Sequence, residues 1–169
     1  MEEIRNKVAE SGLITLDWSD WYRPSELAYI DIKDWLFEEV LLREKDFRQQ
    51  LKDFDWSPYQ GKILHFSCSS DAIIPPWAYM LLAVSAQPYV KWSFYGTQES
   101  FLQAYWSWVV DDLDLEQFKD QRVILKGCGD LPVPDSAFLQ LSARLSSVVK
   151  SLMFGEACST VPVYKQRKK

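Results

Sequence analysis

Three cysteines give this chain its most specific chemistry, and each stands in a turn-like segment. Cys68 lies among serines, Cys128 lies between two glycines, and Cys158 lies between an alanine and a serine. A cysteine that only packs as a small hydrophobic residue belongs inside an apolar stretch, whereas thiols in Gly, Ser and Asp loops can reach metals, substrates or one another. The placement of the three thiols therefore predicts a site.

Cys68 and Cys128 are expected at one edge of a sheet. Residues 62–68 (KILHFSC) and 122–126 (RVILK) are apolar runs that predict buried strands, and each leads into one of these two cysteines. The binding crevice of an open α/β sheet lies outside the carboxyl ends of its strands. If the two strands are parallel, both thiols leave the sheet at that crevice.

A metal site is the first use that these residues suggest. The thiols of Cys68, Cys128 and Cys158 with one further ligand match the tetrahedral preference of zinc. Cys158 reaches the other two only if residues 151–154 form an extended segment that returns to the same edge. No C-x-x-C pair, the usual mark of a structural zinc site, occurs in the chain. The candidates for the fourth ligand are a water, Asp71, Asp130 and His65.

A nucleophilic thiol is the second use, and Cys68 is its best candidate. Such a thiol needs a nearby base, commonly histidine. The only histidine, His65, lies three positions before Cys68 on the same predicted strand, and an odd offset places the two side chains on opposite faces of the sheet. His65 is therefore predicted to be a buried or half-buried structural residue. Catalytic residues stay undefined, and purely structural thiols are the third interpretation.

The aromatic segment 18–22 supports a different class of function. Trp18, Trp21 and Tyr22 lie in a polar, turn-rich stretch, where the sequence gives no apolar pattern that would bury them. Aromatic residues are enriched at the centres of protein interfaces. The alternative hypothesis is therefore a noncatalytic interaction protein, a homodimer or an adaptor, that uses this loop.

Composition narrows the partners and the compartment. The 169-residue chain has 24 Asp and Glu against 19 Lys and Arg, a net charge of −5, which disfavours nucleic acid because that binding depends on clustered cations. No apolar stretch is long enough to span a bilayer. The acidic start MEEIR does not resemble a secretory signal. We expect a cytoplasmic protein without a membrane partner, in which the basic residues 165–169 form a frayed tail.

The order of the expected elements predicts an α/β fold. Strands are expected at 13–16, 27–32, 62–68, 89–95 and 122–126, and helices at 2–10, 44–54, 76–87, from 97 and from 135. Residues 35–42 fit a buried helix and a strand equally well. Strands that alternate with helices form a mostly parallel or mixed central sheet flanked by helices. No repeat or linker divides the chain, so residues 1–164 are predicted to form a single domain.

Long segments of the chain also allow a comparison with a known family. The segments are SCSSDAIIPPWAYMLLA, KGCGDLPVPDSA and SLMFGEACSTVPVYK, with SGLITLD and DIKDWLF nearer the N-terminus. Over about Glu3 to Lys165 the chain resembles an uncharacterised family from Bacteroidetes, a domain of unknown function (family 2480). The resemblance implies a bacterial, cytoplasmic, complete single-domain protein. It implies no activity, cofactor or catalytic residue.

These patterns lead to one leading hypothesis of function. The sequence predicts a cytoplasmic α/β protein with a cysteine-lined site for a small-molecule ligand or zinc at the carboxyl ends of the strands. The residues assigned to this site are Cys68, Asp71, Cys128 and Cys158. The alternatives are the interaction protein with the aromatic loop and the thiol enzyme with Cys68 as nucleophile.

Overall fold

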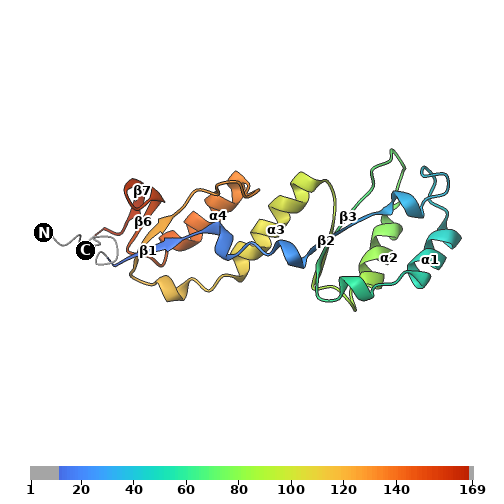
Figure 1. Ribbon diagram of the computed structural model, residues 1–169, viewed down its shortest axis with the longest axis horizontal. Coiled ribbons are helices and arrows are strands. Elements are labelled where there is room, and N and C mark those ends of the chain that lie inside the picture. The colour runs from blue at the N-terminus through green and yellow to red at the C-terminus, as the bar shows by residue number, and fades with distance from the viewer. Residues whose placement is uncertain (1–11, 168–169) are drawn as a thin grey trace, which may run out of the picture. The chain divides into compact units, whose positions relative to one another are not determined.

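The computed structural model describes residues 12–167 and contains two β-sheets (Figure 1). The chain divides into two compact units, which we call the host unit (Met1–Tyr22 with Leu102–Lys169) and the inserted unit (Arg23–Phe101). Each sheet is built from strands of one unit. The α/β class is confirmed, but the single central sheet predicted from the sequence is wrong, because consecutive strands of the inserted unit pair only with one another.

The inserted unit holds a three-stranded parallel sheet in the order β2-β3-β4. Its strands are β2 (Leu27–Asp31), β3 (Ile63–Ser67) and β4 (Trp92–Tyr95), and the crossover helices are α1 (Glu44–Asp53) and α2 (Pro76–Ala86). These elements were predicted with small shifts of their ends. Parallel neighbours need such crossovers, and in this sheet the order of the strands is the same as their order in the chain.

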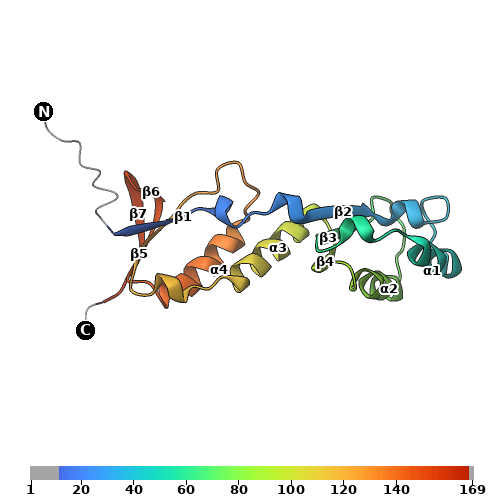
Figure 2. The same cartoon turned by 60° about the horizontal axis from the view of Figure 1, so that its bottom comes forward.

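One face of this sheet is covered by α1 and α2 (Figure 2). Phe47 and Leu51 lie four residues apart on α1, so both side chains leave the helix on one side and enter the core. Leu64 and Phe66 meet them from β3, with 0% and 2% of their surface exposed. Burial of each such side chain contributes roughly 1.5–3 kcal/mol. The alternation of β3 leaves His65 and Ser67 on the opposite face.

Residues 35–42 form neither of the two elements that the sequence allowed. A 3₁₀ helix ends at Trp35, and an isolated bridge then joins Phe37 to Leu41. Glu38 and Glu39 between them have φ angles of 49° and 61°, which neither a helix nor a strand accepts. The prediction of a buried element is also wrong, since Phe37 and Leu41 are 38% and 53% exposed. The guanidinium of Arg43 covers the Phe37 ring at 3.1 Å.

The host unit holds a four-stranded sheet in the order β1-β5-β6-β7, in which only β7 is antiparallel. Its strands are β1 (Leu13–Leu16), β5 (Arg122–Leu125), β6 (Ser151–Glu156) and β7 (Ser159–Lys165), and its helices are α3 (Gln98–Asp112, which begins in the inserted unit) and α4 (Asp135–Ser146). Helix α4 connects β5 to β6 and buries Ala137, Leu141 and Leu145, at i, i+4 and i+8, in the core. Short 3₁₀ helices cover Trp18–Asp20, Pro24–Glu26, Ile32–Trp35, Ser57–Tyr59 and Glu116–Phe118.

The C-terminal strands β6 and β7 differ from the sequence prediction in the added strand β7 and in the start of the tail. The returning segment expected at 151–154 exists as β6, while β7 was not predicted. Lys165 pairs with Ser151 as the last residue of β7, and Gln166 N donates to Lys150 O at 2.9 Å. The prediction that a frayed tail starts at residue 165 is therefore wrong.

The helix predicted at 2–10 lies outside the described residues. Within residues 12–167, no helix is both long and apolar enough to cross a membrane.

Candidate functional site

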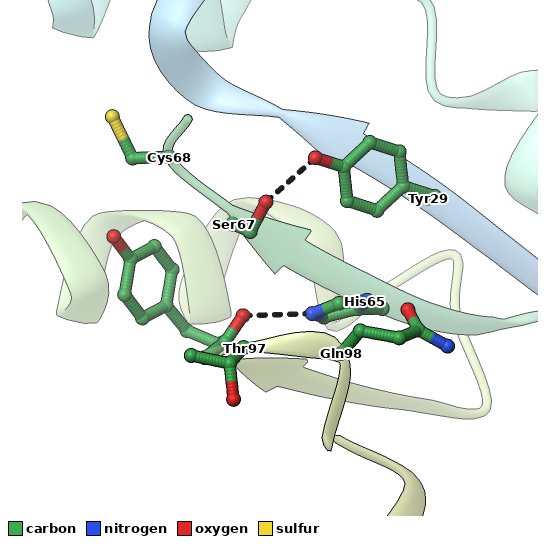
Figure 3. A pocket seen from close by; sticks show the side chains of 8 residues that line it. Tyr29, His65, Ser67, Cys68, Thr97 and Gln98 are labelled. Atoms are coloured by element: carbon green, nitrogen blue, oxygen red, sulfur yellow. Dashed lines mark hydrogen bonds between the residues drawn. The ribbon is translucent and has the colours of Figure 1, made fainter. Parts of the chain in front are cut away.

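A pocket of about 510 Å³ lies at the carboxyl ends of the three-stranded sheet (Figure 3). Its walls come from the ends of all three parallel strands and from the start of α3. Open parallel sheets bind their ligands at this edge. The lining residues are Tyr29, His65, Ser67, Cys68, Tyr95, Gly96, Thr97 and Gln98.

A pair of hydroxyl groups spans two strands of the pocket. Tyr29 Oη and Ser67 Oγ are 2.6 Å apart, and Figure 3 shows the two side chains pointing toward each other from β2 and β3. One hydroxyl donates to the other, so the pair keeps one hydrogen and free lone pairs for a ligand. Tyr29 is 53% exposed, and its ring is tilted against the His65 ring at a centroid distance of 5.3 Å, so part of the Tyr29 ring stays open for stacking.

His65 is held by its strand and by the turn after β4. Its ring is 3% exposed and stacks on Phe101 at a centroid distance of 4.6 Å. Nε2 lies 2.8 Å from the carbonyl oxygen of Gly96 (Figure 3). A carbonyl only accepts, so Nε2 carries the hydrogen, and the tautomer with a single hydrogen on Nε2 has an acceptor at Nδ1. The prediction that His65 is buried is confirmed.

Glycine at position 96 leaves room for the side chains that crowd this turn. A Cβ atom built there would lie 2.6 Å from Ser100 Oγ and 2.8 Å from the Phe94 ring. The missing side chain lets the backbone approach closely, so that Gly96 N donates to Phe66 O while Gly96 O accepts from His65. The turn thereby fixes the imidazole against the floor of the pocket.

Cys68 follows β3 directly and is half-buried. It packs with the α1 and α2 core beside Leu64 and Phe66, on the sheet face opposite His65. Figure 3 shows the thiol pointing away from the imidazole, as the odd offset in the sequence predicted. Its Sγ atom lies 3.3 Å from Ser70 Oγ. A Cys68/His65 catalytic pair is therefore absent from this pocket.

Asp31 holds the loop that follows β3, next to the pocket residues Ser67 and Cys68. Its Oδ1 accepts from Ser69 N at 3.1 Å and from Lys33 N at 2.9 Å. Burial acts to raise the pKa of Asp31, but hydrogen bonds from Ser69 and Lys33 outweigh it and the pKa is lowered. The carboxylate stays ionised and ties the end of β2 to the loop after β3.

The pocket lining contains no Asp, Glu, Lys or Arg. Burial raises the pKa of Tyr95, with hydrogen bonding to Tyr79 as a further cause, so the Tyr95 hydroxyl stays protonated and can donate. Charges flank the amino ends of the strands instead, where Lys91 Nζ lies 3.4 Å from Glu26 Oε2 and Lys62 Nζ donates to a carbonyl. The pocket lining is thus polar but uncharged, while the ionised Asp31 stands at the same edge of the sheet outside the lining.

The predicted shared edge for Cys68 and Cys128 is wrong. Cys68 follows β3 of the three-stranded sheet, while Cys128 follows β5 of the four-stranded sheet. Within residues 12–167, no group of three or more His, Cys, Asp and Glu side chains is arranged to hold a metal ion. The zinc site of Cys68, Asp71, Cys128 and Cys158 stays a prediction. The reason for it, that Cys68 and Cys128 follow strands of one sheet, no longer holds.

Cys128 and Cys158 are the two thiols that follow neighbouring strands. β5 and β6 are parallel and in register, with Leu125 opposite Phe154. Cys128 is half-buried in the loop after β5, and Cys158 is exposed in the two-residue turn between β6 and β7. Of the two thiols expected near Cys128, the strand order removes Cys68 from its sheet and keeps Cys158 after the neighbouring strand, because strand neighbours cannot be derived from apolar runs alone.

An ion network ties the carboxyl ends of the host unit's three parallel strands. Lys126 Nζ, after β5, lies 2.9 Å from Asp17 Oδ2, after β1, and 3.6 Å from Glu156 Oε1 of β6. Hydrogen bonds from Lys126 and Ser19 lower the pKa of Asp17 to about 2. The hydrogen bond and charge of Asp17 raise the pKa of Lys126. Lys126 therefore stays protonated, which suits a strand clamp and not a nucleophile.

Trp18 anchors the aromatic loop in the core of the host unit. Trp18 is fully buried and packs at 5.7, 5.3 and 4.8 Å against Trp21, Trp106 and Phe138. Tyr22 stacks on Trp106 at 5.8 Å. Burial of Trp18 removes one of the three aromatic side chains on which the interaction-protein hypothesis was based, while Trp21 and Tyr22 are half-buried. That hypothesis stays a prediction. Asp17 caps a 3₁₀ turn here, and that turn points Trp18 inward.

A family model covers nearly the whole chain. The model described as "Protein of unknown function (DUF2480)" matches residues 2–166. The chain belongs to this family. Its description assigns no activity, so the pocket geometry of this DUF2480 member carries the functional argument. No curated protein and no solved structure matches the chain.

Several pocket residues of this DUF2480 member were missed at the level of sequence. Tyr29 and Ser67 are 38 positions apart and meet only because Tyr29 lies opposite His65 in the β2–β3 register. Gln98 and Thr97 belong to the expected start of a helix, and that start after β4 is the signal that could have placed them at the same edge.

Proposed function

We propose that the inserted unit binds a small uncharged organic molecule rich in hydrogen-bonding groups, such as a sugar or a nucleoside. The observation that carries this proposal is the pocket of about 510 Å³ at the carboxyl ends of the three-stranded sheet. Its volume lies in the range of small-molecule sites, about 300–1,000 Å³. Its lining offers hydroxyl, imidazole and amide groups, with no carboxylate, ammonium or guanidinium.

The uncharged lining favours an uncharged ligand. A charged group taken from water into the pocket would meet no opposite charge among the lining residues, so the lining would not compensate its desolvation. The start of α3 is the one feature that favours an anion. Its Ser100 N–H and Phe101 N–H already donate to Thr97 Oγ1 and Thr97 O, which weakens that attraction.

Three groups in the lining suit the recognition of hydroxyl and amide groups. The Tyr29–Ser67 pair can donate one hydrogen and accept at free lone pairs. The Gln98 amide can donate and accept at once, and Nδ1 of His65 can accept. The exposed ring of Tyr29 offers an apolar face against which a sugar or a base can stack.

The test is ligand-observed NMR with matched pairs of compounds. Neutral hexoses and nucleosides are compared with the corresponding sugar acids and nucleoside monophosphates. We expect binding of neutral members, with the charged members at least ten-fold weaker. Ser67→Ala and Gln98→Ala are expected to weaken binding five-fold or more, because each removes a hydrogen-bonding group from the lining.

A matched control separates the pocket from general effects. Gln87→Ala removes the same side chain from an exposed position after α2, outside the pocket, and should leave affinity unchanged. Equal affinities of the Gln98→Ala and Gln87→Ala variants would contradict the proposal, as would tighter binding of the charged compounds. A wild-type protein that binds neither class would also contradict it.

The thiol enzyme is a second candidate, favoured by the position of Cys68 in the lining of the same pocket. A catalytic thiolate reacts faster than its exposure alone allows. Alkylation by iodoacetamide at pH 7, followed by mass spectrometry, compares half-buried Cys68 with exposed Cys158. Exposure predicts that Cys158 is modified several-fold faster. Faster modification of Cys68 would favour the enzyme, and slower modification would count against it.

A further inference from the structure

A second pocket, of about 340 Å³, lies in the host unit and is lined by residues of α4, β5, β6 and β7. It is separate from the pocket of the proposed function, which belongs to the inserted unit. An inference about the second pocket therefore does not depend on the proposed function. Its chemistry is also different, because most of its walls are apolar.

The floor and the rim of this pocket are made of large apolar side chains. Leu125 and Leu152 are 2% and 1% exposed and belong to the core. The rings of Phe138 and Phe154 meet edge to face at 6.1 Å. Phe154 and Val163, in contrast, keep 41% and 54% of their surface exposed. A ligand that covers these side chains would remove apolar surface from water.

An irregularity in the strand pairing helps to shape the pocket. The register of β6 and β7 shifts between Leu152 and Met153, so that Tyr164 and Pro162 have partners while Val163 is skipped. A β-bulge of this kind turns the extra side chain away from the regular alternation. Here the extra residue, Val163, forms part of the pocket wall.

Helix α4 supplies the two polar side chains of the lining. Asp135, Phe138 and Ser142 are spaced by three and four residues and therefore form one stripe of the helix. Seven residues of helix place Asp135 and Ser142 roughly 10 Å apart along the axis. Within residues 12–167, neither side chain makes a hydrogen bond or an ion pair. No Lys, Arg or His lines the pocket to match the carboxylate.

We propose that this pocket binds a primary amine with an aromatic or branched apolar body, its ammonium group paired with Asp135. The carboxylate is the only charge in the lining, and Asp135 stands at an exposed position three residues before Phe138 on the same helix stripe. An acid in the first turn of a helix also interacts with the helix dipole. The helix dipole explains the carboxylate but not the exposed side chains of Phe154 and Val163. An amine with an apolar body would pair with the carboxylate and also cover these two side chains.

The experiment compares three ligands of one shape that differ in charge. Isothermal titration calorimetry of the full chain measures 3-phenylpropylamine, 3-phenylpropan-1-ol and 3-phenylpropanoate. The amine is expected to bind at least ten-fold tighter than the alcohol, and the carboxylate weakest of the three. Asp135→Asn is expected to remove the preference for the amine while the affinity for the alcohol is kept, which also shows that the pocket is still folded.

Two further variants complete the test. Asp130→Asn removes the same charge from an exposed loop position outside the pocket and should keep the ten-fold preference. Phe154→Ala should weaken the amine and the alcohol together, because both lose the same apolar contact. Equal affinities of amine and alcohol in the wild type would overturn the proposal. So would an Asp135→Asn variant that keeps the preference, or an equal loss in Asp130→Asn.

Discussion

Two buried indoles of the host unit differ in what their N–H groups meet. Trp106 Nε1 donates to the carbonyl oxygen of Pro132 at 2.9 Å. Trp18 Nε1 is buried, and residues 12–167 provide it with no hydrogen-bond partner. Both side chains are fully buried and contact each other. A buried donor without a partner costs free energy that the ring packing of Trp18 has to offset.

This difference leads to a prediction for two matched substitutions. Trp18→Phe and Trp106→Phe remove the same atoms, but only the second breaks a hydrogen bond and leaves a carbonyl without its donor. We expect Trp106→Phe to lower the free energy of unfolding by about 1–2 kcal/mol more than Trp18→Phe. Urea unfolding followed by circular dichroism measures both variants. Equal losses, or a larger loss in Trp18→Phe, would contradict the prediction.

Polar side chains join the ends of neighbouring strands in both units. In the host unit, Lys126 joins the ends of β1, β5 and β6 through Asp17 and Glu156. In the inserted unit, Asp31 joins the end of β2 to the loop after β3. Parallel strands bring their carboxyl ends together, so residues distant in the chain meet there.

The strand clamp predicts a pH dependence of stability. The pKa of Asp17 is lowered from 3.8 to about 2 in the folded protein. Its contribution is therefore complete above about pH 4 and is lost as the pH falls toward 2. Asp17→Asn should lower the free energy of unfolding at pH 7 by less than about 1 kcal/mol, because the pair is partly exposed. It should also make the loss of stability between pH 4 and 2 smaller than in the wild type.

Urea midpoints at pH 7, 4 and 2.5 measure this effect. Asp20→Asn, at an exposed carboxylate of the same 3₁₀ turn, serves as the control and should follow the wild-type pH profile. A steeper acid profile for Asp17→Asn than for the wild type would contradict the sign derived from the lowered pKa.

The segment that forms one sheet is inserted in the chain between two segments that form the other sheet. The inserted unit interrupts the host unit after Tyr22, and the boundary at its other end falls inside α3. Each unit has its own core and four of the eight tryptophans. The tryptophans of the host unit are Trp18, Trp21, Trp106 and Trp108, and those of the inserted unit are Trp35, Trp56, Trp77 and Trp92.

We keep the sequence-based expectation of a single domain as a prediction about unfolding. Fluorescence and far-ultraviolet circular dichroism should show one coincident urea transition. Leu51→Ala in the inserted unit and Leu141→Ala in the host unit each remove a buried side chain. Each should lower the free energy of that single transition by about 2–5 kcal/mol. Two separate transitions in either variant would show that the units unfold independently.

Local patterns in the sequence were sufficient for most elements and for one feature of the site. The spacing of Phe47 and Leu51 predicted α1, and the run around His65 predicted β3. The same alternation placed His65 and Cys68 on opposite faces, as observed. Periods of 3.6 and 2 residues arise from the backbone of one segment, so they can be read without knowledge of the fold.

The tertiary structure decided which segments meet. Strand pairing separated Cys68 from Cys128 and brought Tyr29 to Ser67. Packing by α3 and α4 buried Trp18, which its polar neighbours had suggested was exposed. Hydrogen bonds of a sheet and contacts of a core join residues far apart in the chain, and their choice depends on all segments at once. The sequence by itself therefore determined the α/β class, and the pairing of its strands determined where a ligand can bind.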